Sequence, residues 1–496
     1  MAQEAPPRDQ ALETLVLLRL STELATKSKG TRRRFLRKLV ENLKEALRAI
    51  GASYRIESQW SRIFVKTSAS PDALKVLRQI PGLSSYSIVV ARSAARLEDI
   101  VRVGVEHFTP LVQGRSYAVR ARRSGVHDFR SSDVLQTLGA ALNPGARVDL
   151  RNPEVEVALE VREQEVYFYS GSERGAGGLP LGVEGRAVCL VSGGFDSAVA
   201  AWMLLKRGVQ LDYVFCNLAG DAYERSVALV AKVLADDWSF GTRPKLHIVD
   251  FTDVVDNLRA NSAPRYWQLV LKRLMYRAAD RIGRQQRANG IVTGEAIGQV
   301  SSQTLTNLAA IDGASSLPIF RPLIAFDKMD IIELTRTIGT FHLSSTVKEY
   351  CAIAPGKPAT GATARQTEDE EAKLDLTLLE RAIASRRILD LRALLPADLI
   401  VNYIFIDSVP EDSIIVDVRE DAEWDAWHHS EAVHVPAWSL LADPRQLDRE
   451  RGYVLYCDAG IQSAQIAESM QRAGYEAYAL RGGTAALRQL SEARTR

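Results

Sequence analysis

Hydrophobic spacing divides the 496-residue chain into blocks of predicted helix and strand. Near the N-terminus, the apolar run TLVLLRL (14–20) predicts a strand. Apolar residues then recur at helical spacing, which predicts an amphipathic helix over 32–50, and a further helix is predicted at 97–108. The segments VEVALEV and VYFYS (155–170) alternate apolar and polar residues, as paired strands do. This part of the chain is therefore predicted to be α+β.

From residue 188 to about residue 346, apolar strands alternate with helical segments. The strand candidates are AVCLV, LDYVFCN, KLHIVDF and GIVTG. This alternation is typical of a doubly wound parallel sheet. A polar linker with a helix start follows at 355–373, and then a helical stretch to about Leu395. From Ser413, the strand-like SIIVDVRE, VLYC and EAYAL predict a second, small α/β unit.

Composition and charge narrow the classes of function. The apolar fraction of 46% and the charged fraction of 25% are ordinary for globular proteins, and the length allows about three domains. The net charge is only +2, so binding of nucleic acid must rest on local basic patches. Two basic clusters together predict a phosphate-binding surface: Arg32, Arg33 and Arg34, then Arg115, Arg120, Arg122, Arg123 and Arg130. For the first cluster, the alternative is a helix face that is simply exposed to solvent.

Cysteine usage and the N-terminus point to a cytoplasmic protein. The four cysteines are widely spaced and form no CxxC pair, which disfavours a disulfide scaffold, a protein-held metal and an iron–sulfur cluster. The N-terminal MAQEAPPRDQ is polar, unlike a signal peptide. No run approaches 18 apolar residues, so we expect no membrane segment.

The stretch SGGFDS (192–197) separates a predicted buried strand from a predicted helix. Glycines at a helix N-terminus let backbone N–H groups approach a phosphate closely. The stretch lacks the GK[ST] ending of a Walker loop. Asp196 would repel phosphates unless it orients Mg²⁺ or a loop amide. A simple strand-to-helix turn is the alternative.

The SGGFDS stretch resembles the SGGxDS loop of ATP pyrophosphatases, the PP-loop enzymes that split ATP into AMP and pyrophosphate. Further segments resemble the ThiI family, the bacterial tRNA uridine 4-sulfurtransferases. These segments are RARRSGVHDFRSSDV, GGLPLG, LKRLMYRAA, VTGEAIGQVSSQTLTNL and RPLIAFDKMDII. The resemblance implies a ferredoxin-like domain (10–70), a THUMP RNA-binding domain (71–172), a PP-loop domain (173–354), a linker and helical connector (355–407) and a rhodanese-like domain (408–494).

The same resemblance implies an ATP site. Its residues would be Leu190, Val191, Ser192, Gly193, Gly194, Asp196, Ser197, Lys272, Gly294 and Gln303. Asp196 and Lys328 would form a catalytic pair near the uridine and the phosphates. Taken alone, Lys272, Gly294 and Gln303 look like ordinary helix or turn residues. Mg²⁺ would accompany the ATP.

Cys457 lies between a predicted strand and a predicted helix, where free N–H groups and the helix dipole favour a thiolate or a persulfide. Its surroundings resemble rhodanese, with the Asp417–Arg419 pair, VHVPAW and LRGGTAAL. The stretch AWHHSEA departs from the usual Gly-His motif and leaves His428 or His429 for the histidine position.

The other three cysteines differ in what they imply. Cys351, in EYCAIAP, alone would be a structural thiol, but the family resemblance implies a transient disulfide with Cys457. Cys189 and Cys216 lie in apolar strands and are predicted to be core residues.

The leading hypothesis is an enzyme that adenylates O4 of a tRNA uridine, by analogy uridine 8, and replaces it with persulfide sulfur from a cysteine desulfurase. A thiol reductant would restore the cysteines, and the family suggests a homodimer. One alternative is sulfur transfer to a carrier protein for thiazole synthesis, alone or as well. Others are a tRNA-binding scaffold with an inactive loop and an amidating PP-loop synthetase, which would use neither a persulfide nor an RNA-binding half.

Overall fold

The structure is a computed structural model. It describes residues 14–59, 62–218, 221–345, 358–395, 404–419, 421–442, 444–457 and 461–494. The chain divides into two compact units, one formed mainly by residues up to 185 and the other mainly by residues from 186 onward. Within the described ranges, no helix is both long enough and apolar enough to cross a membrane.

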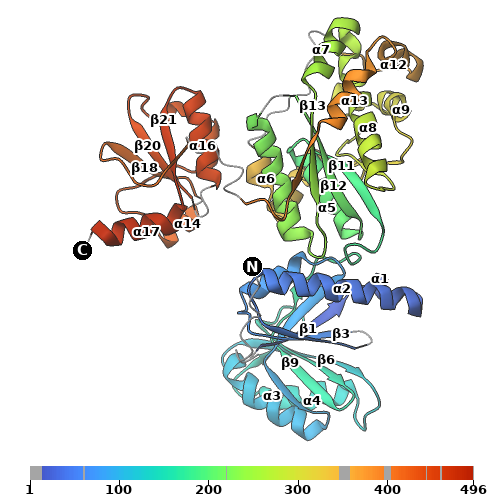
Figure 1. The fold of residues 1–496 in the computed structure, drawn as a ribbon. Coiled ribbons are helices and arrows are strands. Elements are labelled where there is room, and N and C mark those ends of the chain that lie inside the picture. Colours follow the sequence, from blue (N-terminus) through green and yellow to red (C-terminus); the bar gives the residue numbers. More distant parts are fainter. Residues whose placement is uncertain are drawn as a thin grey trace, which may run out of the picture. The chain divides into compact units, whose positions relative to one another are not determined.

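The first sheet of the first unit has the strand order β10-β4-β1-β3-β2. Its elements are β1 (Thr14–Leu20), α1 (Thr22–Ala25), α2 (Lys29–Ala49), β2 (Tyr54–Ser58), β3 (Arg62–Thr67), the 3-10 helix η1 (Ala73–Gln79), β4 (Leu83–Val89) and β10 (Glu173–Arg174). Helix α2 lies along this sheet (Figure 1), and Phe35, Leu39 and Leu43 of the helix are buried in the core between them. Strand β4 pairs with β1, so the sheet continues past the boundary predicted at residue 70. Backbone hydrogen bonds between β1 and β4, which are distant in sequence, therefore decide where this domain ends.

The second sheet has the order β5-β9-β8-β6-β7. Its elements are β5 (Ala91–Ala94), α3 (Leu97–Val112), β6 (Ser116–Ser124), α4 (Ser131–Leu142), β7 (Arg147–Val148), β8 (Val155–Arg162) and β9 (Glu165–Tyr169). Strands β8 and β9 form the predicted pair, and they run antiparallel. Helices α3 and α4 lie side by side on this sheet (Figure 1). Leu17 and Phe64 of the first sheet share an apolar cluster with Tyr167 and Tyr169, so the two sheets pack together.

The second unit contains two sheets, and the one formed by residues 186–390 has the strand order β15-β14-β11-β12-β13-β16. Its strands are β11 (Arg186–Leu190), β12 (Gln210–Asn217), β13 (Lys245–Asp250), β14 (Ile291–Val292), β15 (Ile319–Phe320) and β16 (Arg387–Asp390). The helices are α5 (Phe195–Lys206), α6 (Asp221–Trp238), α7 (Thr252–Asn261), η2 (Pro264–Tyr266), α8 (Trp267–Gln285), η3 (Ser301–Gln303), α9 (Leu305–Asp312), α10 (Lys328–Ile338), α11 (Phe341–Ser345), α12 (Ala364–Glu371) and α13 (Leu376–Ala384).

This sheet is the predicted doubly wound one, with α6 and α8 on opposite faces (Figure 1). Strand β11 lies between β12, which follows it in sequence, and β14, which comes later. The strand order therefore reverses at β11. Ligands of open α/β sheets bind in the crevice beyond the carboxyl end of such a strand.

The predicted helical connector after residue 355 needs a correction. Helices α12 and α13 are followed by strand β16, which pairs antiparallel with β13, with Ile388 opposite His247. The open edge of β13 offers unpaired backbone groups, and this pairing satisfies them. The segment that was predicted to be helical up to Leu395 therefore contributes the edge strand of the sheet.

The C-terminal sheet has the order β17-β21-β20-β18-β19, and all its pairs are parallel. Its strands are β17 (Phe405–Ile406), β18 (Ser413–Asp417), β19 (Val433–His434), β20 (Gly452–Tyr456) and β21 (Glu476–Leu480). The helices are α14 (Asp421–Ala426), α15 (Ala437–Ala442), η6 (Pro444–Gln446), α16 (Ile461–Arg472) and α17 (Gly483–Arg494). This is the second, small α/β unit that the sequence predicts.

Candidate functional site

The SGGFDS loop lies directly beyond the carboxyl end of β11, at the point where the strand order reverses. Gly193 has φ +73°, a conformation that glycine adopts without strain. Ser197 Oγ donates to the carbonyl of Gly194 at 3.2 Å and accepts from the N–H of Ser192 at 3.3 Å. Because α5 begins at Phe195, the loop and the first N–H groups of a helix together suit a phosphate.

Asp196, in the first turn of α5, is the centre of a charged contact. Lys328 Nζ, at the start of α10, donates to both carboxylate oxygens, at 2.8 and 2.9 Å. Gln299 Nε2 donates to Oδ2 at 2.9 Å. The side chains of Asp196 and Lys328 are 19% and 38% exposed, so the pair is accessible at the crevice. Folding thus brings the two residues of the predicted catalytic pair together from positions 132 residues apart.

Gly294 lies where the segment after β14 passes the start of α5. A Cβ at this position would lie 2.6 Å from the carbonyl carbon of Asp196 and 2.7 Å from the nitrogen of Ser197. Real Cβ atoms do not approach backbone so closely. A glycine here therefore lets two loops meet at the carboxyl ends of β11 and β14.

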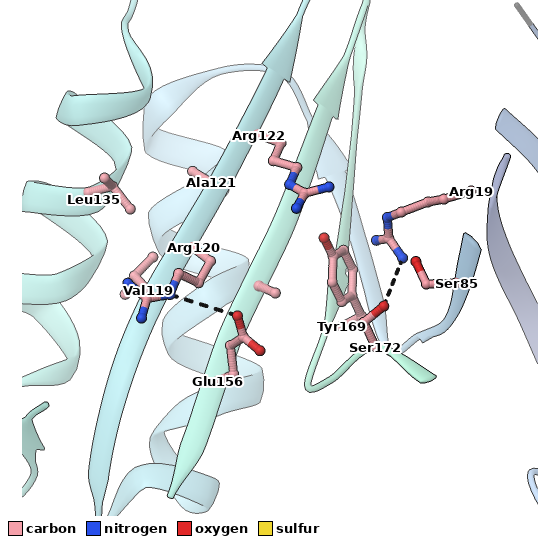
Figure 2. A pocket seen from close by; sticks show the side chains of 11 residues that line it. Arg19, Ser85, Val119, Arg120, Ala121, Arg122, Leu135, Glu156, Tyr169 and Ser172 are labelled. Carbon is pink, nitrogen blue, oxygen red and sulfur yellow. Dashed lines mark hydrogen bonds and ion pairs between the residues drawn. The ribbon is translucent and has the colours of Figure 1, made fainter. Parts of the chain in front are cut away.

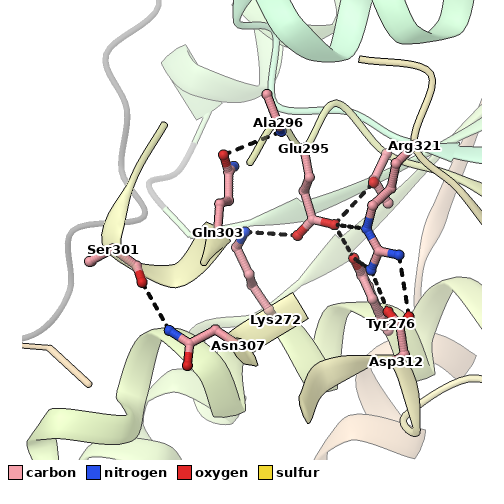
Figure 3. Close-up of polar contacts among 10 residues, drawn as sticks. Lys272, Tyr276, Glu295, Ala296, Ser301, Gln303, Asn307, Asp312 and Arg321 are labelled. Carbon is pink, nitrogen blue, oxygen red and sulfur yellow. Dashed lines mark hydrogen bonds and ion pairs between the residues drawn. The ribbon is translucent and has the colours of Figure 1, made fainter. Parts of the chain in front are cut away.

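Lys272 belongs to a buried polar network around Glu295 (Figure 3). Glu295 Oε1 accepts from Lys272 Nζ at 2.8 Å, and Oε2 accepts from Arg321 Nε at 2.9 Å and from the hydroxyl of Tyr276. Burial would raise the pKa of Glu295, but Lys272, Tyr276 and Arg321 outweigh burial and lower it to about 2. The carboxylate therefore stays ionised and fixes the ammonium group of Lys272.

Gln303 contacts the backbone that connects Glu295 with η3. Its Oε1 accepts from the N–H of Ala296 at 3.4 Å, and its carbonyl accepts from the N–H of Gly298 at 2.9 Å. Just before the SGGFDS loop, the N–H of Val191 donates to Val214 of β12, and Leu190 ends β11. The residues predicted for an ATP site thus lie on the SGGFDS loop, directly before it, or in or against the segment 294–303.

Sequence reasoning missed four residues of this site. Glu295 and Gln299 lie inside the segment VTGEAIGQVSSQ, Tyr276 inside LKRLMYRAA and Arg321 at the start of RPLIAFDKMDII. These four residues could have been proposed because they lie inside the segments that resemble the ThiI family. The contacts that they make could not be predicted, because folding brings their partners together.

Cys457 follows β20 directly and is 5% exposed. Its Sγ accepts from the N–H of Ser463, in α16, at 3.4 Å and lies 3.5 Å from Ser463 Oγ. Beside it, the buried Asp417 accepts from Arg419 Nε at 2.9 Å and from Nη2 at 2.7 Å.

The two candidate histidines of the C-terminal domain lie against aromatic side chains. His428 stacks on Trp424 with ring centroids 3.8 Å apart, and the N–H of His429 donates to the hydroxyl of Tyr456 at 3.3 Å. Cys189 and Cys216 are buried core residues, as predicted. Burial raises the pKa of the Cys189 thiol. Cys351 lies outside the described residues.

The predicted basic surface needs one correction. Arg32 is only 5% exposed, because it lies on the same face of α2 as the buried Phe35 and Leu39. The remaining predicted arginines are exposed: Arg33, Arg34, Arg115, Arg120, Arg122, Arg123 and Arg130. Arg120 and Arg122 lie on β6.

Arg120 and Arg122 also line a cavity of about 430 Å³ in the first unit (Figure 2). Its other polar walls include Arg19, Ser85, Glu156, Tyr169 and Ser172. Arg19 is held by Glu160 at 2.7 Å, and Arg120 lies 3.8 Å from Glu156. Guanidinium groups beside an aromatic ring suit the phosphates and bases of RNA. Sequence reasoning missed Arg19, which lies in an otherwise apolar strand.

No group of three or more His, Cys, Asp or Glu side chains among the described residues could hold a metal ion.

Four family models match the chain in succession. They are the ThiI ferredoxin-like domain over residues 15–87, the THUMP domain over 94–170, the thiamine biosynthesis protein ThiI over 182–376 and the rhodanese-like domain over 406–489. These matches confirm the four domain types predicted from the sequence.

Relatives match over nearly the full length. A tRNA sulfurtransferase of Desulfurococcus amylolyticus is 38% identical, over 95% of this chain and 98% of that protein. A tRNA sulfurtransferase of Marinobacter nauticus is 35% identical, over 93% and 98%. The crystal structure of a 4-thiouridine synthetase–RNA complex with bound ATP matches with a TM-score of 0.66 and 29% identity, covering 76% of this chain and 99% of that chain. The chain therefore belongs to the ThiI family of tRNA sulfurtransferases.

Proposed function

We propose that this chain converts a tRNA uridine, by analogy uridine 8, to 4-thiouridine in an ATP-dependent reaction. The observation that carries this proposal is the SGGFDS loop at the reversal point of the sheet, with Asp196 paired to Lys328. The names of the relatives and the RNA and ATP of the related crystal structure support the same substrates.

The first step is adenylation. O4 of the uridine attacks the α-phosphorus of ATP, and pyrophosphate leaves. The loop N–H groups and Lys272 would hold the phosphates, while Mg²⁺ arriving with the nucleotide neutralises their charge. Lys328 would stabilise charge on the phosphates, and Asp196 would orient it near the uridine. The product carries AMP, a good leaving group, on O4.

The second step is sulfur transfer. A cysteine desulfurase would load Cys457 as a persulfide. The terminal sulfur attacks C4 of the uridine, AMP leaves, and a disulfide joins C4 sulfur to Cys457. The thiolate of Cys351 then attacks Sγ of Cys457 and releases the thiouridine. A thiol reductant supplies the two electrons that reopen the resulting Cys351–Cys457 disulfide, as expected of a catalytic disulfide in the cytoplasm.

The first unit would bind the tRNA. Exposed arginines and the cavity beside β6 offer contacts to phosphates and to an unstacked base. Two copies of the chain are proposed to form the functional homodimer, as the family suggests.

A second function is proposed for the C-terminal domain. Cys457 and the Asp417–Arg419 pair form a site within that domain alone, without any residue of the SGGFDS loop. That domain matches the rhodanese-like family model, and the preceding domain matches a model named for thiamine biosynthesis, which is the context in which we propose transfer to a carrier protein. Both functions would use the same persulfide.

The test of the main proposal is reconstitution. Purified protein is incubated with unmodified tRNA, ATP, Mg²⁺, cysteine, a cysteine desulfurase and a thiol reductant, and near-ultraviolet absorbance of the tRNA reports 4-thiouridine. Wild type should form product, and Asp196→Ala and Cys457→Ala should not. Asp253→Ala, at an exposed position of α7, and Cys216→Ala, in the core, serve as matched controls that keep activity. Sulfur delivered to a carrier protein without 4-thiouridine would favour the second function.

A further inference from the structure

Gln299 is the one side chain besides Lys328 that the described contacts place on the Asp196 carboxylate. We propose that Gln299 is a positioning residue, which keeps Asp196 in place while Lys328 engages the anionic substrate. This inference rests on the proposed ATP-dependent activation of uridine and adds a residue to that site.

The geometry allows the two donors to act together. Oδ2 of Asp196 accepts from Gln299 Nε2 at 2.9 Å and from Lys328 Nζ at 2.9 Å, while Oδ1 accepts from Lys328 at 2.8 Å. An ionised carboxylate has about four acceptor positions, so these three bonds do not compete. Only the NH₂ group of an amide can donate, and the carboxylate therefore fixes the orientation of the Gln299 amide.

The backbone on both sides of Gln299 is itself held. The N–H of Gly298 donates to the carbonyl of Gln303 at 2.9 Å, and the N–H of Ile297 donates to Ile324 at 3.1 Å. After Gln299, the N–H of Gln303 donates to the carbonyl of Val300 at 2.8 Å. The amide of Gln299 is thus presented from a fixed loop, as a positioning group requires.

The difference in charge between the two donors gives them different roles. Lys328 is a cation, and its side chain is 38% exposed at the crevice, so phosphates of a bound nucleotide attract it. When Lys328 also engages the phosphates, its attraction for Asp196 weakens, and without a second donor the carboxylate would swing away from the negative charge. The neutral Gln299 has no net charge to be drawn to phosphate. It therefore keeps the carboxylate in its rotamer throughout the reaction.

The test is the substitution Gln299→Glu, which keeps the shape of the side chain and removes the donor. We expect kcat for tRNA thiolation to fall about 10- to 100-fold, while the KM for ATP stays within about threefold of wild type. Gln299→Met, which also lacks the donor but adds no charge, should lower kcat in the same way. Gln286→Glu, at the end of α8, is the matched control and should retain the wild-type kcat.

Three results separate the possibilities. A kcat within twofold of wild type in both Gln299→Glu and Gln299→Met would overturn the positioning role. A rise in the KM for ATP with kcat unchanged would also overturn it, because Gln299 would then act only in binding. Asp196→Asn and Lys328→Met run beside them: if these two variants thiolate tRNA at the wild-type rate, the proposed catalytic pair itself is wrong, whatever Gln299 does.

Discussion

Gly294 shows how one residue without a side chain sets the distance between two loops. Its backbone passes so close to Asp196 and Ser197 that a methyl group would lie 2.6 Å from a backbone carbon. Neither partner is the end of a flexible side chain, so the start of α5 would have to shift. We predict that Gly294→Ala lowers the rate of tRNA thiolation about 100-fold, as displacements of about 1 Å in an active site do.

The measurement is the initial rate of 4-thiouridine formation at saturating ATP and tRNA. Gly361→Ala is the matched control, because a Cβ at that position meets no atom within 4 Å. It should keep the wild-type rate. A normal rate in Gly294→Ala would show that the loops separate without harm to the site.

At the residue scale, the sequence indicated individual candidate residues but not the contacts between them. Asp196 and Lys328 were identified through the segments that contain them, and the structure adds their direct contact. The role of Glu295 could not be predicted, since a buried carboxylate is explained only by the cations around it, and Lys272 and Arg321 lie 23 and 26 residues away in the sequence. Arg32 was misjudged because its charge was given more weight than the helical spacing, which places position 32 on the same face of α2 as Phe35 and Leu39.

At the element scale, strand β16 and its partner β13 carry a pH-dependent contact. His247 of β13 is fully buried, and its Nδ1 accepts from Arg386 Nε, just before β16, at 3.2 Å. Burial, with a smaller effect of Arg386, lowers the pKa of His247 from 6.5 to about 4. Between pH 6.5 and 4, the unfolded chain therefore binds a proton that the folded chain does not.

We predict that this sheet loses about 3 kcal/mol of stability as the pH falls from 6.5 to 4, because unfolding takes up that proton. The stability is fully present above pH 6.5. Hydrogen exchange at the β13 amides measures the change. His247→Gln should remove most of the loss between pH 6.5 and 5, where the carboxylates do not yet titrate, and His107→Gln, at an exposed position of α3, should leave it unchanged. An equal loss in wild type and His247→Gln would exclude His247 as its source.

Long apolar strands could be predicted from the sequence, whereas the short strand β16 could not. Strands β11, β12 and β13 were predicted because long apolar runs mark buried parallel strands. Strand β16 has only four residues, and their partners in β13 lie 139 to 145 residues earlier in the sequence. A short edge strand after a helix has no periodicity that distinguishes it from the end of that helix. Pairing between distant segments decided its structure.

At the scale of the whole molecule, a chain with a net charge of only +2 must concentrate its positive charge to bind RNA. The described part of the first unit does so with exposed arginines on α2, β6 and the turns around them. Each arginine that neutralises a phosphate releases counterions from the RNA. The affinity for tRNA should therefore fall steeply with salt.

The last prediction assigns that dependence to single residues. Arg122→Ala and Arg34→Ala should each weaken tRNA binding and reduce the slope of log Kd against log salt by about 1, because each removes one phosphate contact. Arg281→Ala is the control, since Arg281 belongs to the second unit, is paired there with Glu380 and is not one of the arginines predicted to bind RNA. Titrations of labelled tRNA at several KCl concentrations give the slopes. Unchanged slopes in both variants, with weaker binding in Arg281→Ala, would place the RNA on the second unit instead. A reduced slope for Arg122→Ala alone would assign the contact to β6 and the cavity beside it rather than to α2.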